Sequence, residues 1–186
     1  MKLTRMERFA VGMFDRALFD GDVLAFSDAE NGHLAEAYGK LSHIVYLQFS
    51  RLVADGWRFT PTNNGTKLPN MRLAFATQKL EVYQGHCVHP FFSETMNWKF
   101  RAAHDVLGYG PENPRTAFSL KSERQAYKKH ACQVVNLGIN DIRDTLSVLW
   151  VEVVGQAAFY AKRRRFPFQA AFFPHARYLD PVSLDV

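Results

Sequence analysis

Apolar residues recur at intervals of three and four along much of this chain, the spacing that places side chains on one face of an α-helix. Ser27 and Glu30 form the pattern of an N-terminal helix cap, and Gly56 stands where helix-ending glycines occur. The positions between them predict a helix over residues 28–55. Its apolar stripe consists of Leu34, Tyr38, Leu41, Val45, Phe49 and Leu52.

Four further stretches have helical periodicity and recognisable capping residues. They run from a capping box at Thr4 and Glu7 to the turn at Asp20, from Ser93 to Gly108, over about residues 119–137, and from Asn140 to the basic run ending at Arg165. Residues 71–76 and 80–83 instead alternate between apolar and other side chains, which predicts one or two short strands arranged as a hairpin. We therefore predict a mainly α, helical-bundle-like single domain over residues 1–186, with about five helices, a small β-hairpin element and an irregular aromatic-rich tail (166–186) packed on the bundle.

Composition indicates a folded globular chain, because 47% of its 186 residues are hydrophobic and 22% are charged. The two cysteines, Cys87 and Cys132, are too few for a disulfide framework and are expected to be buried free thiols. Charged residues such as Arg5 and Glu7 interrupt the N-terminal region, so no signal peptide is predicted. No membrane span is predicted either, because no window of the chain approaches 18 uncharged apolar residues. We expect a protein of the cytoplasm, or of a particle assembled there, without a membrane partner.

The net charge of +5 is distributed unevenly. Residues 121–165 carry nine basic and four acidic side chains, so this segment holds the whole excess. The candidate contacts for nucleic acid or another polyanion are Lys121, Arg124, Lys128, Lys129, Lys162, Arg163, Arg164 and Arg165. The alternative is a solvated helix face followed by cations that interact favourably with the C-terminal dipole of the last helix.

Three ionisable side chains fall on helix faces that periodicity predicts to be buried. His104 lies on the inward stripe of the helix before residue 108, and Glu123 and His130 share the inward stripe of the next helix. Such groups are costly to bury unless they are paired, ligated or neutral. Asp105 follows Arg101 by four residues and is expected to pair with it.

Three explanations are open for these residues. His104, Glu123 and His130 are candidate ligands of a divalent metal (zinc, manganese or iron), as in metal sites inside helical bundles. Seven residues of helix separate Glu123 from His130 by about 10 Å, which makes one shared ion harder to hold. The second explanation is a metal-free hydrogen-bond network through Tyr127, and the third is that these side chains are exposed and unrelated to one another. A second candidate source of metal ligands is the loop with His86, Cys87 and His89.

The chain lacks several motifs that would indicate a reaction. It contains no phosphate-binding Gly-x-x-x-x-Gly-Lys-Ser/Thr, no Gly-x-Gly-x-x-Gly, no Gly-x-Ser-x-Gly and no His-Glu-x-x-His. No RNA-recognition or helix-turn-helix signature is present. The usual forms of nucleotide hydrolysis, dinucleotide binding and serine hydrolysis therefore have no support from the sequence.

A longer pattern crosses the middle of the chain: His89-Pro90, Phe100-Arg101-x-x-His104-Asp105-x-x-Gly108, Phe118 and Glu123-x-x-Ala126-x-x-x-His130. This order resembles a family of uncharacterised proteins encoded by tailed bacteriophages. The similarity extends from the helix near residues 34–56 to residues 169–174, and so over most of the chain. It implies a phage origin and a candidate site formed by His104, Asp105, Glu123 and His130, without a particular reaction.

The sequence departs from the family pattern at Tyr109, where the family has a second histidine, and at Ser122, where it has glycine. If that histidine pair binds a metal, Tyr109 can replace one member only as a weaker, phenolate ligand. The leading hypothesis is therefore an accessory protein that acts by binding a host protein, a nucleic acid or a virion component. The alternative is a metal-dependent enzyme, a hydrolase, in which Asp105 orients a histidine ligand.

Overall fold

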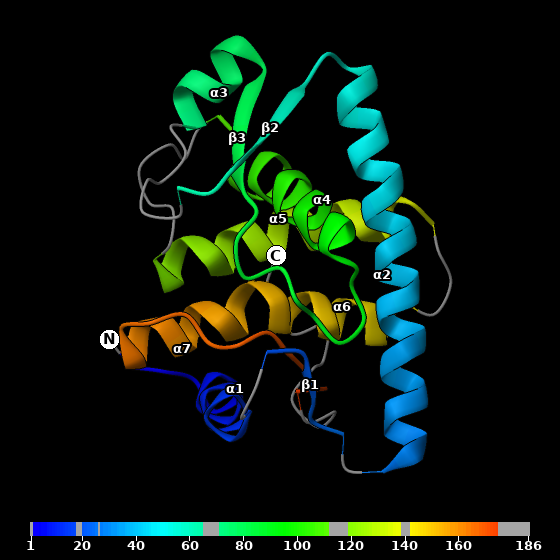
Figure 1. Cartoon of the computed structure of the whole chain (residues 1–186), viewed down its shortest axis with the longest axis vertical. Coiled ribbons are helices and arrows are strands. Elements are labelled where there is room, and N and C mark those ends of the chain that lie inside the picture. Colours follow the sequence, from blue (N-terminus) through cyan, green and yellow to red (C-terminus); the bar gives the residue numbers. More distant parts are fainter. Residues whose placement is uncertain are drawn as a thin grey trace.

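The computed structural model describes residues 2–17, 20–25, 27–64, 71–111, 119–138 and 142–174. The described chain is mainly helical with two small strand pairs, as predicted (Figure 1). Its elements are α1 (Arg5–Arg16), β1 (Asp22–Val23), α2 (Asp28–Ala54), β2 (Arg58–Thr62), α3 (Met71–Thr77), β3 (Lys79–Tyr83), α4 (Glu94–His104), the π-helical segment η1 (Asp105–Tyr109), α5 (Leu120–Asn136), α6 (Arg143–Trp150), the π-helical segment η2 (Val151–Gly155), α7 (Gln156–Arg163) and β4 (Ala170–Ala171). Phe118, Asn140 and residues 175–186, to which some sequence predictions refer, lie outside the described residues.

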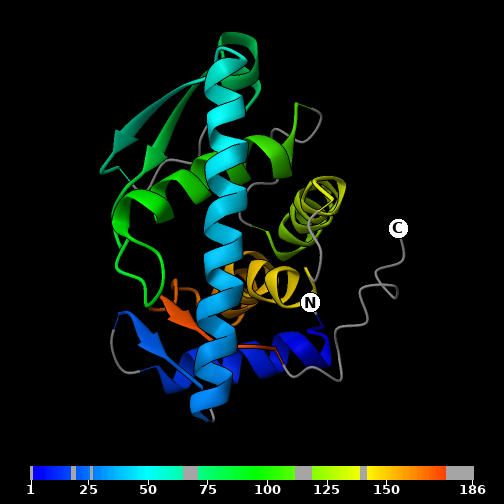
Figure 2. The same ribbon diagram turned by 90° about the vertical axis from the view of Figure 1, so that its right-hand side faces the viewer.

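The two N-terminal helices begin at the predicted caps. Thr4 and Glu7 form a complete capping box at α1, and the Ser27 side chain accepts a hydrogen bond from the Glu30 N–H at α2. Gly56 follows α2 with φ 99°, a conformation that glycine adopts without strain. Figure 2 shows α2 running along nearly the whole height of the molecule. Cap and apolar stripe agree in α2, which is why its bounds could be predicted within one residue.

The predicted hairpin over residues 71–83 does not form, and only its second predicted strand is present. Residues 71–77 form α3, in which Met71 and Ala74 are buried and Leu73 is 57% exposed. The second half is β3, which pairs in parallel with β2. A parallel pair needs a crossover connection, and α3 lies within it. The apolar run at residues 71–76 is too short for its periodicity to separate strand from helix.

Two apolar clusters make up the core of the described chain, and most of the elements that carry them lie in the lower half of Figure 1 for the first and in the upper half for the second. One lies among α1, the first part of α2, α6, η2 and α7; the other lies among the end of α2, α3, β3 and η1. Phe100 on α4 belongs to the first cluster, whereas Val106 and Tyr109 on η1 belong to the second. α4 and η1 therefore pass from one cluster to the other, and the candidate polar residues lie where the clusters meet.

The C-terminal aromatic segment packs on the bundle as far as it is described. β4 pairs in parallel with β1, and Phe172 is fully buried with its ring against the rings of Phe9 and Phe14. The last predicted helix is divided into α6, η2 and α7. Among the described residues, no helix is both long enough and apolar enough to cross a membrane.

Candidate functional site

The π-helical segment η1 decides which residues at the end of α4 share a face. In an α-helix, residues five apart point in different directions, whereas a π-turn joins residue i to residue i+5. Because η1 runs from Asp105 to Tyr109, Tyr109 lies beside His104, with ring centroids 5.5 Å apart. The helix therefore does not stop at Gly108 as predicted, but at Gly110, which has φ 67°.

Glu123 brings α5 to this pair of side chains. One of its carboxylate oxygens lies 3.4 Å from Nε2 of His104, and the other accepts a hydrogen bond from the Tyr109 hydroxyl. The side chains of His104 and Glu123 are only 10% and 7% exposed. The structure thus brings His104 and Glu123 together, as the sequence predicts, and adds Tyr109 as a third member. We refer to His104, Tyr109 and Glu123 as the Glu123 cluster.

Close packing of η1 on α5 depends on Gly108. A Cβ atom at this position would lie 3.0 Å from Cβ of Ala126 and 3.0 Å from Cε1 of His104, closer than side chains normally pack. Glycine therefore allows the two helices to approach, and the same contact restricts where the His104 ring can lie. This role differs from the helix-ending role that the sequence suggested.

His130 lies next to the Glu123 cluster but has a different polar partner. Its ring centroid is 5.7 Å from that of His104, while its Nε2 lies 2.9 Å from Oε1 of Gln48 on α2. Burial, together with the charge of His104, lowers the pKa of His130 to about 3, so the ring is neutral at physiological pH. The predicted network through Tyr127 is wrong, because the Tyr127 hydroxyl donates to the carbonyl oxygen of Leu146.

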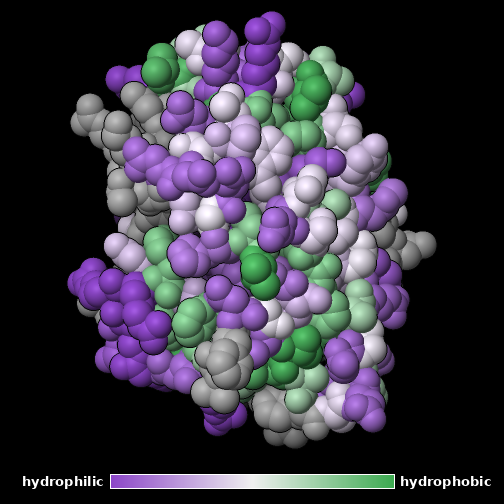
Figure 3. Space-filling view, in the orientation of Figure 1, coloured by the Kyte–Doolittle hydropathy of each residue, from purple (hydrophilic) through white to green (hydrophobic). Residues whose placement is uncertain are grey.

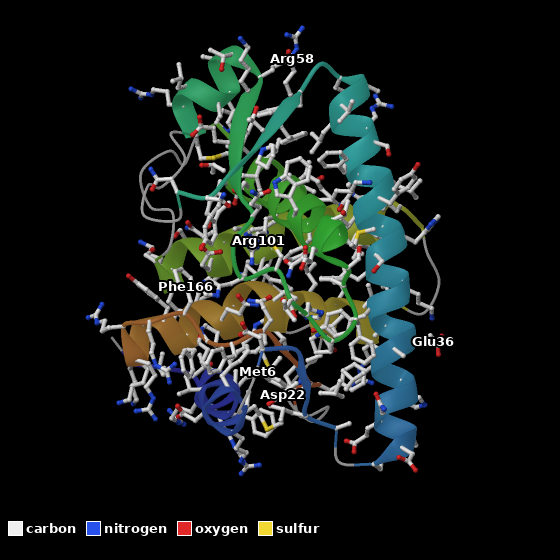
Figure 4. All side chains as sticks on the ribbon, viewed as in Figure 1. Met6, Asp22, Glu36, Arg58, Arg101 and Phe166 are labelled. Carbon is white, nitrogen blue, oxygen red and sulfur yellow. The ribbon has the colours of Figure 1, made fainter. Side chains whose placement is uncertain are left out.

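Asp105 does not form the predicted ion pair with Arg101. The Arg101 guanidinium, labelled in Figure 4, instead donates to backbone carbonyl oxygens of residues 83–86. Burial raises the pKa of Asp105 to about 7; the nearby charge of His104 opposes this shift and that of Glu123 adds to it. Asp105 therefore changes its charge near neutral pH, although no described hydrogen bond ties it to the cluster.

The described residues contain no group of three or more His, Cys, Asp and Glu side chains arranged to hold a metal ion. His104 and Glu123 are close, but Nε2 of His130 is occupied by Gln48. Within the described part of the chain, Nδ1 of His104 and Nδ1 of His130 are buried and have no hydrogen-bond partner. Together with Nε2 of Gln48, which is also buried without a partner, these two nitrogen atoms are the unused polar groups of the site among the described residues.

The loop with His86, Cys87 and His89, the second predicted source of metal ligands, also does not group its side chains to hold a metal ion. Cys87 and His89 are buried, whereas His86 is exposed. Burial raises the pKa of the Cys87 thiol, which keeps it in its less reactive, protonated form. Cys132 is exposed, so the prediction that both thiols are buried is wrong for this residue.

A second buried network, which the sequence analysis missed, centres on Glu152 in η2. Oε1 of Glu152 accepts a 2.6 Å hydrogen bond from the Tyr38 hydroxyl and lies 3.2 Å from Nε2 of His89, while Oε2 accepts from Gln156. Nδ1 of His89 accepts from the N–H groups of residues 91 and 92, so its Nε2 carries the hydrogen that faces Glu152. Glu152 lies in an apolar helical stretch without a motif, so only its unusual position among valines could have drawn attention.

Two of the eight basic candidates hold helices together. Arg124 on α5 donates from Nε and from a terminal nitrogen to Glu7 on α1, which is 1% exposed. Arg163 on α7 forms a similar two-pronged pair with Asp15 at the end of α1. Both guanidinium groups are therefore engaged within the protein.

The other six basic candidates belong to exposed residues: Lys121, Lys128, Lys129, Lys162, Arg164 and Arg165. Lys129 also donates to the carbonyl oxygen of Tyr109. We refer to residues 162–165 as the basic end of α7; no carboxylate among the described residues pairs with Lys162, Arg164 or Arg165 there. Hydrophilic side chains gather over this end of the helix (Figure 3).

Comparison of the chain with protein-family models, with curated proteins and with solved structures finds no match in any of the three. The resemblance to a phage family therefore stays a prediction. The function has to be argued from the two polar networks and from the basic end of α7.

Proposed function

We propose that this chain is a phage-encoded accessory protein that acts without catalysis, by binding nucleic acid through the basic end of α7. The observation that carries the proposal is the exposure of Lys162, Arg164 and Arg165 without a carboxylate partner in the described part of the chain. Cations presented in this way attract the phosphate backbone, and their contact releases counterions from it. The buried network around Glu152 then serves to fix the fold that carries this surface.

The backbone of Arg164 supports the proposal. Arg164 caps α7 with φ 60° and ψ 23°, the left-handed conformation in which glycine is the least strained residue. An L side chain costs about 1 kcal/mol there. Lys162 and Arg163 already supply positive charge in the last turn of α7, so the helix dipole alone does not explain an arginine at position 164. A contact with phosphate does explain it.

The test is the charge reversal Lys162→Glu/Arg164→Glu, which leaves the ion pair of Arg163 intact. Binding of a labelled oligonucleotide is followed by fluorescence anisotropy between about 50 and 200 mM salt. We expect at least about a 10-fold loss of affinity at the lower salt concentration, and a slope of log K against log salt that is shallower by about 2.

The matched control is Arg58→Glu/Arg72→Glu, which changes the same charge at the opposite end of the molecule, where Figure 4 labels Arg58. It should change affinity far less. Equal losses in the two variants, or no binding of any oligonucleotide by the unchanged protein at the lower salt concentration, would overturn the proposal and leave a host protein or virion component as the partner.

Arg164→Gly separates binding from folding. Glycine relieves the left-handed strain, so the free energy of unfolding should rise by about 1 kcal/mol in urea titrations. The same change removes one cation, so the salt slope should fall by about 0.9 and the affinity should decrease. A variant that is both more stable and an equally tight binder would argue against a role for Arg164 in binding.

A metal-dependent hydrolase is the second candidate, favoured by the unused Nδ1 atoms of His104 and His130 beside Glu123. It predicts stoichiometric zinc, manganese or iron in protein purified without an affinity tag, and its loss in His104→Ala. Tyr109→His, which restores the histidine of the family pattern, should then strengthen metal binding. If the purified protein contained no metal and its melting temperature did not change on addition of zinc, manganese or iron ions, this candidate would be disfavoured.

A further inference from the structure

Two phenylalanine side chains are exposed directly after the basic end of α7. Phe166 is 55% exposed and Phe168 is 41% exposed, whereas Pro167 and Gln169 are buried. Successive side chains of an extended chain point to opposite sides. The alternating burial therefore indicates that both phenylalanine rings face outward on one side of the segment.

The segment is held at both ends, so the rings are presented by a defined backbone. The Phe166 ring lies 4.8 Å from that of Tyr160 on α7, and Figure 4 shows Phe166 beside the end of this helix. On the other side, Gln169 accepts a hydrogen bond from Asn97, and the next two residues pair with β1. Two exposed aromatic rings thus adjoin the exposed cations of the basic end.

We propose that Phe166 and Phe168 form a stacking platform for unpaired bases, so that the ligand is single-stranded nucleic acid; this inference rests on the proposed function. Single-strand binding combines cations that follow the backbone with aromatic rings on which bases stack. In a duplex the bases are already stacked on one another, so exposed rings add little to its binding. The basic end holds the phosphates, and the two rings select a strand whose bases are free.

An anionic membrane surface is the other kind of partner that cations and aromatic rings attract. Membrane-bound helices place a broad apolar face into the lipid. On α7 the apolar residues Ala158 and Phe159 are buried against the core and Ala157, Tyr160 and Ala161 are half-buried, so this helix presents no broad apolar face to lipid. The arrangement therefore favours nucleic acid.

The experiment compares Phe166→Ala/Phe168→Ala with the unchanged full chain, using oligothymidine and a duplex of equal length. Stacking of each base is lost with its ring, so affinity for the single strand should fall about 10-fold to 100-fold or more. Affinity for the duplex should change less than about 3-fold, because its phosphate contacts are retained. The salt slope should not change for either ligand, since no charge is altered.

Two further variants separate stacking from apolar packing. Phe166→Leu/Phe168→Leu keeps apolar volume without an aromatic face and should lose single-strand affinity as the alanine variant does. Phe166→Trp/Phe168→Trp should retain or increase it, with quenching of tryptophan fluorescence as bases stack. Rescue by leucine, or equal single-strand affinity in the alanine variant and the unchanged protein, would overturn the platform.

These outcomes remain distinguishable from failure of the proposed function. If the phenylalanine variants bind normally while Lys162→Glu/Arg164→Glu binds weakly, nucleic-acid binding holds and the platform is wrong. If vesicles containing phosphatidylserine bind more tightly than oligothymidine and the alanine variant loses that binding, the rings contact lipid and the inference is overturned.

Discussion

Two buried glutamates, Glu152 within η2 and Glu123 beside η1, each contact a tyrosine and a histidine, yet their networks differ in completeness. Glu152 is paired at both oxygens, and its histidine, His89, has partners at both nitrogens. Glu123 is also paired at both oxygens, but His104 has a buried Nδ1 without a partner among the described residues. Nδ1 of His130, whose ring is adjacent to that of His104, is also buried without a partner among the described residues.

The difference indicates which network stabilises the fold and which has buried nitrogen atoms that are available to a proton or a ligand. A fully paired buried network stabilises one arrangement of the chain, because any change leaves a polar group unsatisfied. A network with unpaired nitrogens is less stabilising and can exchange protons or accept a ligand. We therefore regard the Glu152 network as part of the framework and the Glu123 cluster as the chemically adaptable part of the core.

The largest expected effect separates the two glutamates directly. Glu152→Leu leaves three groups without a hydrogen-bond acceptor: the hydroxyl of Tyr38, the Nε2 hydrogen of His89 and the amide of Gln156. The substitution should lower the free energy of unfolding by about 3–5 kcal/mol. Glu123→Leu leaves fewer groups without an acceptor and should lower the free energy of unfolding by about 1–3 kcal/mol. Urea titrations of both variants measure the two values. Equal costs would contradict the distinction.

The next effect is a pH dependence confined to the adaptable region. The pKa of Asp105 is about 7 in the folded protein and near 4 in the unfolded chain, so its contribution to stability is full below pH 4 and is lost as the pH rises to about 7. Asp105→Asn removes this loss. The free energy of unfolding of the variant, compared with that of the unchanged protein, should therefore rise by about 2–4 kcal/mol between pH 4 and pH 8.

The measurement is a series of urea titrations across that pH range. Asp20→Asn, at an exposed position in the turn before β1, is the matched control and should change the pH dependence of stability far less than Asp105→Asn does. If the free energy of unfolding changed with pH in the same way in Asp105→Asn and in the unchanged protein, burial would not raise the pKa of this carboxyl group.

The smallest effect compares the glycines of the two π-helical segments. At Gly108 an added Cβ meets Ala126 and His104 at 3.0 Å, whereas at Gly155 its nearest neighbours are 3.5 Å away. Gly108→Ala should therefore destabilise the protein by about 1–3 kcal/mol through overpacking. Gly155→Ala should be neutral or stabilising by up to about 1 kcal/mol. Thermal unfolding of both variants tests this, and a stable Gly108→Ala would show that η1 can move away from α5.

Sequence reasoning succeeded where local and periodic signals agree. α2 and the caps of α1 and α4 follow from short-range patterns, and the inward positions of His104 and Glu123 follow from helical spacing. It failed at α3, because seven residues contain too few turns to separate helix from strand. It also missed the role of Tyr109, since nothing local announces the change from α-helix to π-helix that places this ring beside His104.

The amino-acid pattern alone thus determined the helical class, the N-terminal caps of α1, α2 and α4, the concentration of positive charge and the burial of several ionisable groups, because these depend on neighbours within a few residues. The tertiary structure decided which partners those groups have: Gln48 for His130, 82 residues apart, and Glu7 for Arg124, 117 residues apart. Helix packing brings these pairs together, and spacing along the chain carries no record of it. For the same physical reason, only the fold shows that one buried glutamate is enclosed by donors while the other lies beside unused nitrogens.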